Sequence, residues 1–199
     1  MIRHILFTLL MFSFISTSAQ TEADARKLLD NIAATASSRG GLEITFTAAR
    51  NQSGTLKIKG RKFILQTADV TTWYDGKTQW TYLKSTEEVT VSTPTAAEVA
   101  QINPQSWIQS YRTAYNVKYE GKVGTHHKIG LTPKRANGIQ KIELQISSTT
   151  SKPTQIGLTM SGNKKGTFLI KSYVSKDHPD PLFRFNPKQY PNAEIIDLR

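Results

Sequence analysis

Apolar and polar side chains alternate along the stretch from Gly54 to Pro94. Alternation with a period of two places the apolar side chains on one face of a sheet and the polar ones on the other. The alternation assigns four large side chains to the apolar face: Phe63, Leu65, Trp80 and Tyr82. Asp75-Gly76 between two of these runs predicts a tight turn, because glycine accepts the positive φ that a hairpin turn requires. The apolar face has to be covered either by helices of the same chain or by a ligand.

The same alternation predicts about ten or eleven antiparallel strands along the chain. They are Leu42–Ala48, Thr55–Lys59, Lys62–Thr67, Thr71–Tyr74, Gln79–Lys84, Glu88–Ser92, Val117–Tyr119, His127–Leu131, Ile139–Ile146, Thr154–Met160 and Thr167–Val174. A sheet of this length curls, because strand twist accumulates across it. The sequence therefore predicts an α+β fold, mainly antiparallel β. Its core is a half-open, unclosed β-barrel of about 11 strands with a helical lid over the concave apolar face. The tail from Pro181 to Arg199 is apolar enough to dock on the sheet and close it.

Helical spacing is found in two places. Thr21 is expected to cap a first helix whose apolar face includes Leu29 and Ile32, and which ends before Gly40-Gly41. In the middle of the chain, Thr95 and Glu98 have the spacing of a capping box. Asn103-Pro104 should end that helix and begin another, because Asn suits the cap and Pro the first helical position. The second helix carries three large side chains at helical spacing: Trp107, Ile108 and Tyr111.

The N-terminus has the pattern of a secretory signal peptide. A short basic start at Arg3 and His4 precedes the apolar run Ile5–Ile15, and small residues follow up to Ala19. An N-terminal membrane anchor is the alternative, but the run is shorter than the roughly 20 residues that span a bilayer. We expect residues 1–19 to be removed and residues 20–199 to form one exported domain, since about 180 residues suit a single domain.

Composition narrows the possible chemistry. The 199 residues include no cysteine, which excludes disulfides, thiolate metal sites and a cysteine nucleophile. The formal net charge of +11 is spread along strands and turns instead of forming one basic arm. In an exported protein this charge favours anionic lipid headgroups or acidic partner surfaces over nucleic acid. A solvated basic face without a partner is an equally good interpretation.

Candidate catalytic residues are few. His126 and His127 are adjacent, so on a strand they point to opposite faces and cannot share a metal ion. His178 lies in a turn-like Lys-Asp-His-Pro-Asp segment, and Glu87-Glu88 are strand neighbours that diverge. None of the common hydrolase, zinc-protease or phosphate-loop motifs is present. A triad scattered along the sequence would leave no such motif, but we expect no enzyme, no cofactor and no metal site.

Several motifs together resemble the LolA family of periplasmic lipoprotein carriers, and most of all the LolA-like proteins of Bacteroidetes. The motifs are Gly-Thr-Leu-Lys-Ile-Lys-Gly-Arg-Lys-Phe, Thr-Trp-Tyr-Asp-Gly-Lys-Thr-Gln-Trp-Thr-Tyr, Glu-Glu-Val-Thr-Val, Ile102-Asn103-Pro104 and the ending Pro191–Arg199. The resemblance extends over essentially the whole mature chain. One position departs from the proteobacterial pattern: Gly60 stands where those carriers have an arginine that holds the lid closed. Arg61 beside it is then the candidate latch.

The resemblance implies a cavity for acyl chains between the sheet and the lid. The candidate lining residues are Leu56, Ile58, Phe63, Leu65, Trp80 and Tyr82 from the sheet, with Leu29 and Ile32 from the first helix. The candidate lid residues are Ile102, Trp107, Ile108 and Tyr111. Ordinary core packing is the alternative for each residue taken singly.

The implied function is that of a periplasmic, monomeric carrier of acylated lipoproteins. It would receive cargo from an inner-membrane lipoprotein-releasing ABC transporter complex and pass it to an outer-membrane acceptor that the sequence does not identify. A periplasmic shuttle for lipids or glycolipids, or a sensor of lipoproteins on the same fold, is the alternative.

Overall fold

The computed structural model describes residues 16–37 and 40–199. Within these ranges there are three α-helices: α1 (Ser16–Ala36), α2 (Ala96–Ile102) and α3 (Pro104–Ala114). The first six strands are β1 (Leu42–Thr47), β2 (Ser53–Lys59), β3 (Lys62–Thr67), β4 (Val70–Tyr74), β5 (Gln79–Leu83) and β6 (Glu88–Ser92). The other six are β7 (Tyr115–Val123), β8 (His126–Pro133), β9 (Ile139–Ser147), β10 (Pro153–Met160), β11 (Lys165–Ser175) and β12 (Glu194–Asp197).

All twelve strands belong to one sheet. Their order is β12-β6-β5-β4-β3-β2-β1-β11-β10-β9-β8-β7, so the chain returns beside its first strand through β11. Neighbours are antiparallel except for β12, which runs parallel to β6. The end strands β12 and β7 do not pair with each other, and the sheet is therefore not closed. This confirms the expected open, mainly antiparallel fold with helices, and the apolar tail supplies the additional twelfth strand.

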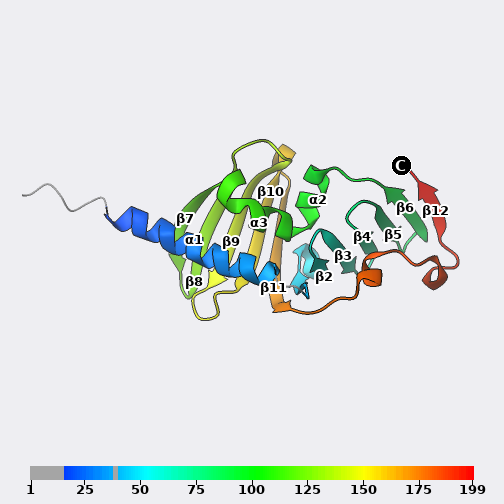
Figure 1. Ribbon diagram of the computed structural model, residues 1–199, viewed down its shortest axis with the longest axis horizontal. Coiled ribbons are helices and arrows are strands. Elements are labelled where there is room, and N and C mark those ends of the chain that lie inside the picture. The colour runs from blue at the N-terminus through cyan, green and yellow to red at the C-terminus, as the bar shows by residue number, and fades with distance from the viewer. Residues whose placement is uncertain (1–15, 38–39) are drawn as a thin grey trace, which may run out of the picture.

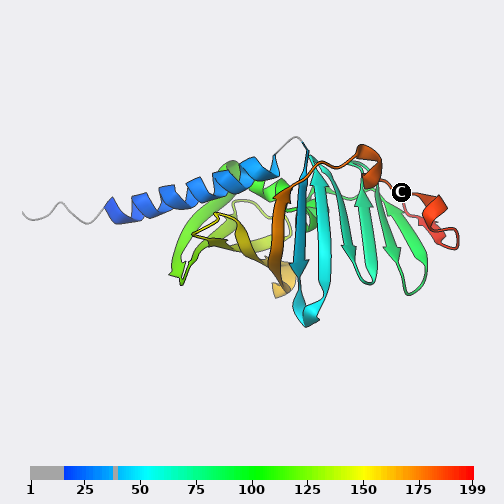
Figure 2. The same ribbon diagram turned by 90° about the horizontal axis from the view of Figure 1, so that it is seen from below.

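The helices cover one part of the sheet. α1 and α3 lie across β7 to β11, whereas α2 lies near the boundary with the half that contains β3 to β6 (Figures 1 and 2). The first turns of α1 project past β7 (Figure 1). α1 begins at Ser16, so the prediction that Thr21 caps it is wrong. Most of the predicted signal peptide lies outside the described residues. No described helix is both long and apolar enough to span a membrane.

The local signals of the middle helices are confirmed. The Thr95 side chain accepts a hydrogen bond from the Glu98 backbone, and the Glu98 side chain accepts one from the Thr95 backbone, which completes the capping box. Asn103 ends α2 and its side chain caps α3, with Pro104 in the first turn. These short-range bonds fix where α2 and α3 begin and where α2 ends, so the chain forms two separate helices that meet at Asn103.

The turn at Asp75-Gly76 connects β4 to β5 as expected. Gly76 has a φ of +102°, which an L side chain rarely adopts. Asp75 Oδ1 accepts hydrogen bonds from the Lys77 and Thr78 backbones at 3.0 and 2.9 Å. Asp75 Oδ2 also pairs with Arg184 Nε at 3.2 Å. The turn is therefore fixed by its own aspartate and also tied to the C-terminal tail.

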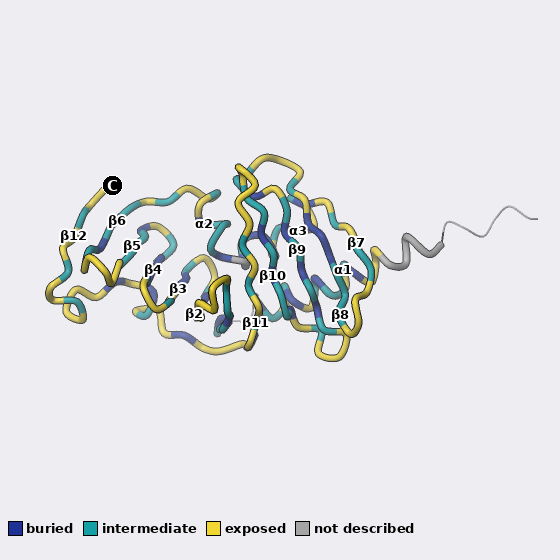
Figure 3. The backbone as a smooth tube through the Cα atoms, turned by 180° about the vertical axis from the view of Figure 1, so that it is seen from behind, coloured by how far each residue is buried: buried dark blue, intermediate teal, exposed yellow. Residues whose placement is uncertain are grey.

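Two apolar clusters lie on opposite faces of the sheet. We call the face on which the helices pack the lid face and the opposite one the tail face, because the C-terminal tail covers part of it. The lid-face cluster combines residues of all three helices with side chains of β1 to β4 and β7 to β11. The tail-face cluster joins β3 to β6 to the tail. Buried residues concentrate in the strands, while hairpin loops and much of the tail are exposed (Figure 3).

Candidate functional site

Six of the eight candidate lining residues meet in the lid-face cluster. Five of them are buried: Leu29, Ile32, Leu56, Ile58 and Phe63. Leu65 is half-buried and packs against the same cluster. The register explains the grouping, because Ile58 pairs with Phe63 and Leu56 with Leu65, and directly paired residues share a face.

Trp80 and Tyr82 do not belong to this lining, and the expectation that they share a face with Phe63 is wrong. Trp80 pairs with Trp73, and Trp73 pairs with Ile64. Ile64 is the chain neighbour of Phe63, and successive strand residues point to opposite faces. Both aromatic side chains accordingly pack in the tail-face cluster. The alternation along β5 is real, but it is out of phase with that of β3.

The tail holds these aromatic side chains in place. The Tyr190 ring lies 4.7 Å from the Tyr82 ring and 5.6 Å from the Trp73 ring, measured between centroids. Phe185 lies 5.5 Å from Trp73 in an edge-on arrangement, and Phe183 is fully buried in the same cluster. Offset and edge-on aromatic pairs of this kind add stability beyond area burial. The predicted docking of the tail is confirmed, and its partner is the face opposite the helices. The prediction that the tail closes the sheet is wrong, because β12 pairs with β6 at one end of the sheet and does not reach β7 at the other.

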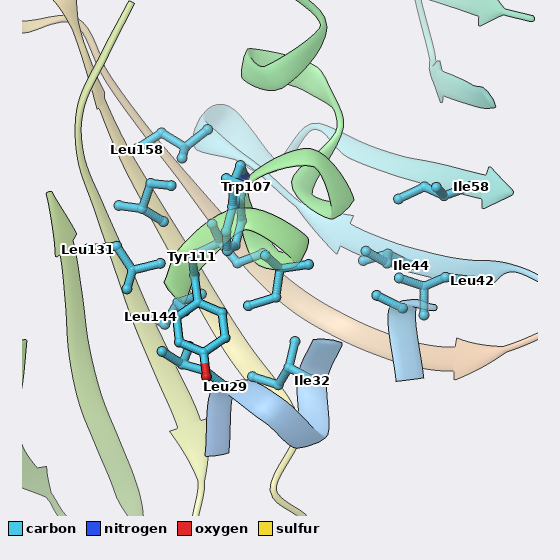
Figure 4. Packing of buried hydrophobic residues seen from close by; sticks show 14 of the residues in the cluster. Leu29, Ile32, Leu42, Ile44, Ile58, Trp107, Tyr111, Leu131, Leu144 and Leu158 are labelled. Atoms are coloured by element: carbon cyan, nitrogen blue, oxygen red, sulfur yellow. The ribbon is translucent and has the colours of Figure 1, made fainter. Parts of the chain in front are cut away.

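The predicted lid residues fill the space above the lid face. Trp107, Ile108 and Tyr111 are each at most 4% exposed, and Ile102 packs against the cluster from α2. Figure 4 shows Trp107 projecting from α3 among the strands, and Tyr111 pointing from α3 toward α1. The remaining cavity between α1, α3 and the strands has a volume of about 10 Å³. That volume is close to the lower limit for one water molecule, so this cavity has no room for a larger guest while the side chains of α3 occupy the space.

A polar clasp joins α3 to α1 at the edge of this interior. The Tyr111 hydroxyl donates to Asp30 Oδ1 at 2.6 Å and to the Arg26 carbonyl oxygen at 3.1 Å. Arg112 donates to both carboxylate oxygens of Asp30. Burial favours a higher pKa for Asp30, but the bonds from Tyr111 and Arg112 outweigh it and lower the pKa below the usual 3.8. Burial, followed by the bond to Asp30, raises the pKa of Tyr111 to about 12.

Arg61 does not take part in this clasp. It lies exposed in the two-residue turn between β2 and β3, and no described side chain bonds to it. Gly60 has a φ of +57°, so a turn conformation that suits glycine occupies the place of the expected arginine. The flanking lysines hold the tail instead, because Lys59 and Lys62 pair with Asp180 at 3.3 and 3.1 Å. The structure therefore corrects the candidate latch: this hairpin is tied to the tail, and the lid is tied to α1.

Sequence reasoning missed three polar residues near the lid: Asp30, Arg112 and Gln105. Asp30 follows Leu29 directly, and nothing in the local pattern separates it from an ordinary exposed carboxylate. Gln105 is only 4% exposed although it stands in the polar first turn of α3. Their partners are about 70 to 80 residues away in the chain, so spacing could not have identified them.

The three histidines that the structure describes, His126, His127 and His178, show no arrangement for metal chemistry. Within the described residues, no group of three or more histidine, aspartate or glutamate side chains could hold a metal ion. His127 Nδ1 and the Tyr119 hydroxyl lie 3.0 Å apart, while the His178 imidazole is buried beside Phe183. His178 thus belongs to the junction between the tail and the rest of the sheet.

Comparison with solved structures identifies the fold. A conserved protein from Thermus thermophilus, described as uncharacterized, has a TM-score of 0.56 at 15% identity, over 87% of this chain and 99% of that chain. A DUF1329 family protein from Desulfovibrio piger has a TM-score of 0.50 at 10% identity, with coverages of 82% and 97%. At such low identity, these two similarities concern the fold alone.

Comparison of sequences identifies the family. No curated protein matches the chain significantly. A family profile described as "Outer membrane lipoprotein carrier protein LolA" matches residues 15–162 of the 199. The match covers well over half of the chain and includes α1, the lid helices and most of the sheet. The protein therefore belongs to the LolA family of outer membrane lipoprotein carrier proteins.

Proposed function

We propose that this protein is a periplasmic carrier that binds the acyl chains of lipoproteins released from the inner membrane and delivers them to the outer membrane. The observation that carries the proposal is the lid: Trp107, Ile108 and Tyr111 are buried on the apolar lid face of an open sheet. Membership of the LolA family supports the same role, as does the N-terminal signal-peptide pattern. The proposed cavity lining is the lid-face set of Leu29, Ile32, Leu56, Ile58, Phe63 and Leu65.

The energetics suit a carrier. Burying a CH₂ group is worth about 0.8 kcal/mol, so exposing one acyl chain to water costs on the order of 10 kcal/mol. A cavity of about 10 Å³ has no room for such a chain. Acyl chains would therefore have to displace the lid side chains and take their place. Because both states bury comparable apolar area, the net affinity stays modest and the cargo can be released.

The partners follow from this role. An inner-membrane lipoprotein-releasing ABC transporter complex would load the protein, and an outer-membrane acceptor would unload it. We propose that the carrier works as a monomer, without a cofactor and without catalysis. Proteins of this family are carriers by description, which agrees with the lack of a catalytic motif in the sequence.

Cargo analysis tests the proposal. The protein is purified from the periplasm of its own host, and the intact complex is weighed by native mass spectrometry. Bound acylated polypeptide is expected, with a ratio of one cargo per protein. Bound free lipid or glycolipid would instead support the lipid shuttle.

In a second test, the protein is depleted from cells. Outer-membrane lipoproteins that stay correctly localised after depletion would contradict the carrier function.

A further inference from the structure

Gln105 places a polar side chain in the apolar interior. It lies in the first turn of α3 and is 4% exposed. It lines the small cavity beneath the lid together with Ile32, Ala36 and Leu42, as well as Trp107 and Ile108 from its own helix. The other lining side chains are aliphatic or aromatic, and their polar groups are the Trp107 indole N–H and the Tyr173 hydroxyl. That hydroxyl already donates to the Ile32 carbonyl oxygen at 3.2 Å.

One end of the Gln105 amide is fixed. Its Nε2 donates to the Ala36 carbonyl oxygen at 2.8 Å. Ala36 is the last residue of α1, and the final carbonyls of a helix have no partner within the helix. Only the NH₂ end of the amide can bond to a carbonyl oxygen, so this contact sets the orientation of the side chain.

The other end of the amide has no partner. Gln105 Oε1 is buried, and no described group donates to it. Leaving a buried acceptor without a hydrogen bond is costly, and the great majority of buried polar groups in proteins have a hydrogen-bond partner. The interior that an acyl chain would enter therefore contains a fixed hydrogen-bond acceptor to which no described residue donates in the closed state.

We propose that Gln105 Oε1 accepts a hydrogen bond from the N–H of a secondary amide that joins an acyl chain to its headgroup. The inference rests on the proposed function, because it assumes that acyl chains displace the lid side chains. An ester linkage has no hydrogen to donate, and neither has a tertiary amide. The acceptor would thus distinguish amide-linked from ester-linked chains, and cargo would satisfy a group that the closed protein leaves unpaired.

Three matched probes test this selectivity on the mature wild-type protein. They are N-palmitoylglycine methyl ester, its ester analogue in which oxygen replaces the N–H, and the N-methylated tertiary amide. Affinities are measured by displacement of a fluorescent fatty-acid analogue below the micelle concentration. We expect the secondary amide to bind about three- to tenfold more tightly than the other two, which is the usual range for one hydrogen bond.

Two substitutions on the same helix separate selectivity from structure. Gln105→Met keeps a side chain of similar length and removes the acceptor. The ratio of the affinity for the secondary amide to that for the other two probes should therefore fall to about one. Gln109→Met is the matched control. Gln109 is also on α3 and its Nε2 also reaches the end of α1, at 3.4 Å from Ser37 Oγ, but it is exposed. The control should retain the full preference.

The outcomes are distinguishable. If no probe binds to the wild type, the carrier function fails and this inference fails with it. If all three bind with equal affinity, the carrier function stands but the role of Gln105 is overturned, and this result needs no variant to fold. A purely structural Gln105 would weaken all probes alike in Gln105→Met and leave their ratio unchanged.

The source of the amide can be distinguished with two larger probes. One is a peptide with an N-palmitoylated amino terminus, and the other is N-palmitoylsphingosine. Tighter binding of the peptide would indicate that Gln105 Oε1 recognises lipoprotein-type cargo. Tighter binding of N-palmitoylsphingosine would indicate that it recognises a free amide-linked lipid. In either case Gln105→Met must reduce the binding of the preferred probe. Unchanged binding would contradict the proposal.

Discussion

The hydroxyl of Tyr111 lies 2.6 Å from Asp30 Oδ1, and this contact joins the lid helix α3 to α1. Tyr111 is 2% exposed, so its ring belongs to the lid-face cluster while its hydroxyl reaches the clasp at the edge. Arg112 adds bonds to the same carboxylate. Tyr111 is thus held both by apolar packing and by hydrogen bonds, and any movement of α3 away from α1 has to break both kinds of contact.

Removing the Tyr111 hydroxyl should weaken the contact between α3 and α1 while the ring remains packed in the lid-face cluster. Tyr111→Phe keeps the ring and deletes the bonds to Asp30 and the Arg26 carbonyl. We expect a loss of about 1 kcal/mol in the free energy of unfolding, measured in urea. We also expect apolar probes to bind up to about fivefold more tightly, because the closed state that competes with them is weakened.

Tyr82→Phe is the control for this prediction. It makes the same chemical change at a half-buried tyrosine on the tail face, where no described group bonds to the hydroxyl. Its stability and probe affinity should stay near the wild-type values. Equal effects of the two substitutions would show that the clasp does not hold the lid.

The two faces of the sheet can be distinguished by matched polar substitutions. Leu65 on β3 and Tyr82 on β5 are both half-buried, but they point to the lid face and the tail face, respectively. Leu65→Gln places an amide where acyl chains are proposed to lie, so probe affinity should fall at least tenfold. Tyr82→Gln should leave affinity within about twofold while both proteins remain folded by circular dichroism. Loss of binding in Tyr82→Gln alone would contradict the assignment of the lining.

Fully buried positions are poor sites for such tests. Phe63 is 0% exposed, and a glutamate there would bury an unpaired carboxylate. A Phe63→Glu protein would lose binding through loss of the fold, which says nothing about cargo. The half-buried Leu65 avoids this difficulty.

Much of the fold could be predicted because its signals are local. The Thr95 and Glu98 capping box, the Asn103 cap and the Asp75-Gly76 turn each depend on residues a few positions apart. The face of a strand is different. Trp73 and Tyr74 are adjacent and both buried, so β4 is apolar on both faces. Alternation along one strand does not show which of its faces lines up with the apolar face of the next strand. For this reason alternation alone assigns Trp80 to the lid face, whereas the register places it on the tail face.

The missed site residues depend on distant parts of the chain. Asp30 meets Tyr111, and Gln105 meets Ala36, only after the helices have packed on the sheet. The aromatic residues of β4 and β5 similarly acquire their cover from Phe183 and Tyr190, about 100 residues later. The spacing of residues within one segment does not predict contacts between distant segments. The register between strands would predict them, but it is known only when the whole sheet is assembled.

Phe183 anchors the tail, and its removal should cost stability but not binding. The side chain is 0% exposed and packs in the tail-face cluster. Truncating a buried phenylalanine to alanine costs about 3–5 kcal/mol. Phe183→Ala should lower the free energy of unfolding in urea by that amount. In buffer without urea, the folded protein should still bind acyl probes with wild-type affinity. A large loss of affinity with little change in stability would place cargo on the tail face.

His178 should make stability depend on pH near neutrality. The imidazole is 3% exposed, and burial lowers its pKa below the usual 6.5. Nearby Glu43 opposes the shift, while Lys57 and Lys176 add to it. Because the unfolded chain binds the proton more readily, the stabilising contribution is complete above pH 6.5 and is lost progressively as the pH falls below it.

Thermal unfolding between pH 8 and pH 5 tests this expectation. The wild-type Tm should fall as the pH drops through 6.5, and His178→Asn should show a smaller decrease over the same interval because it has no proton to gain. His126→Asn serves as the control, since His126 lies at the start of β8, away from the tail. A control that flattens the pH dependence as much as His178→Asn would assign the effect to histidines in general. The junction of the tail with β1 and β11 would then have no special part in it.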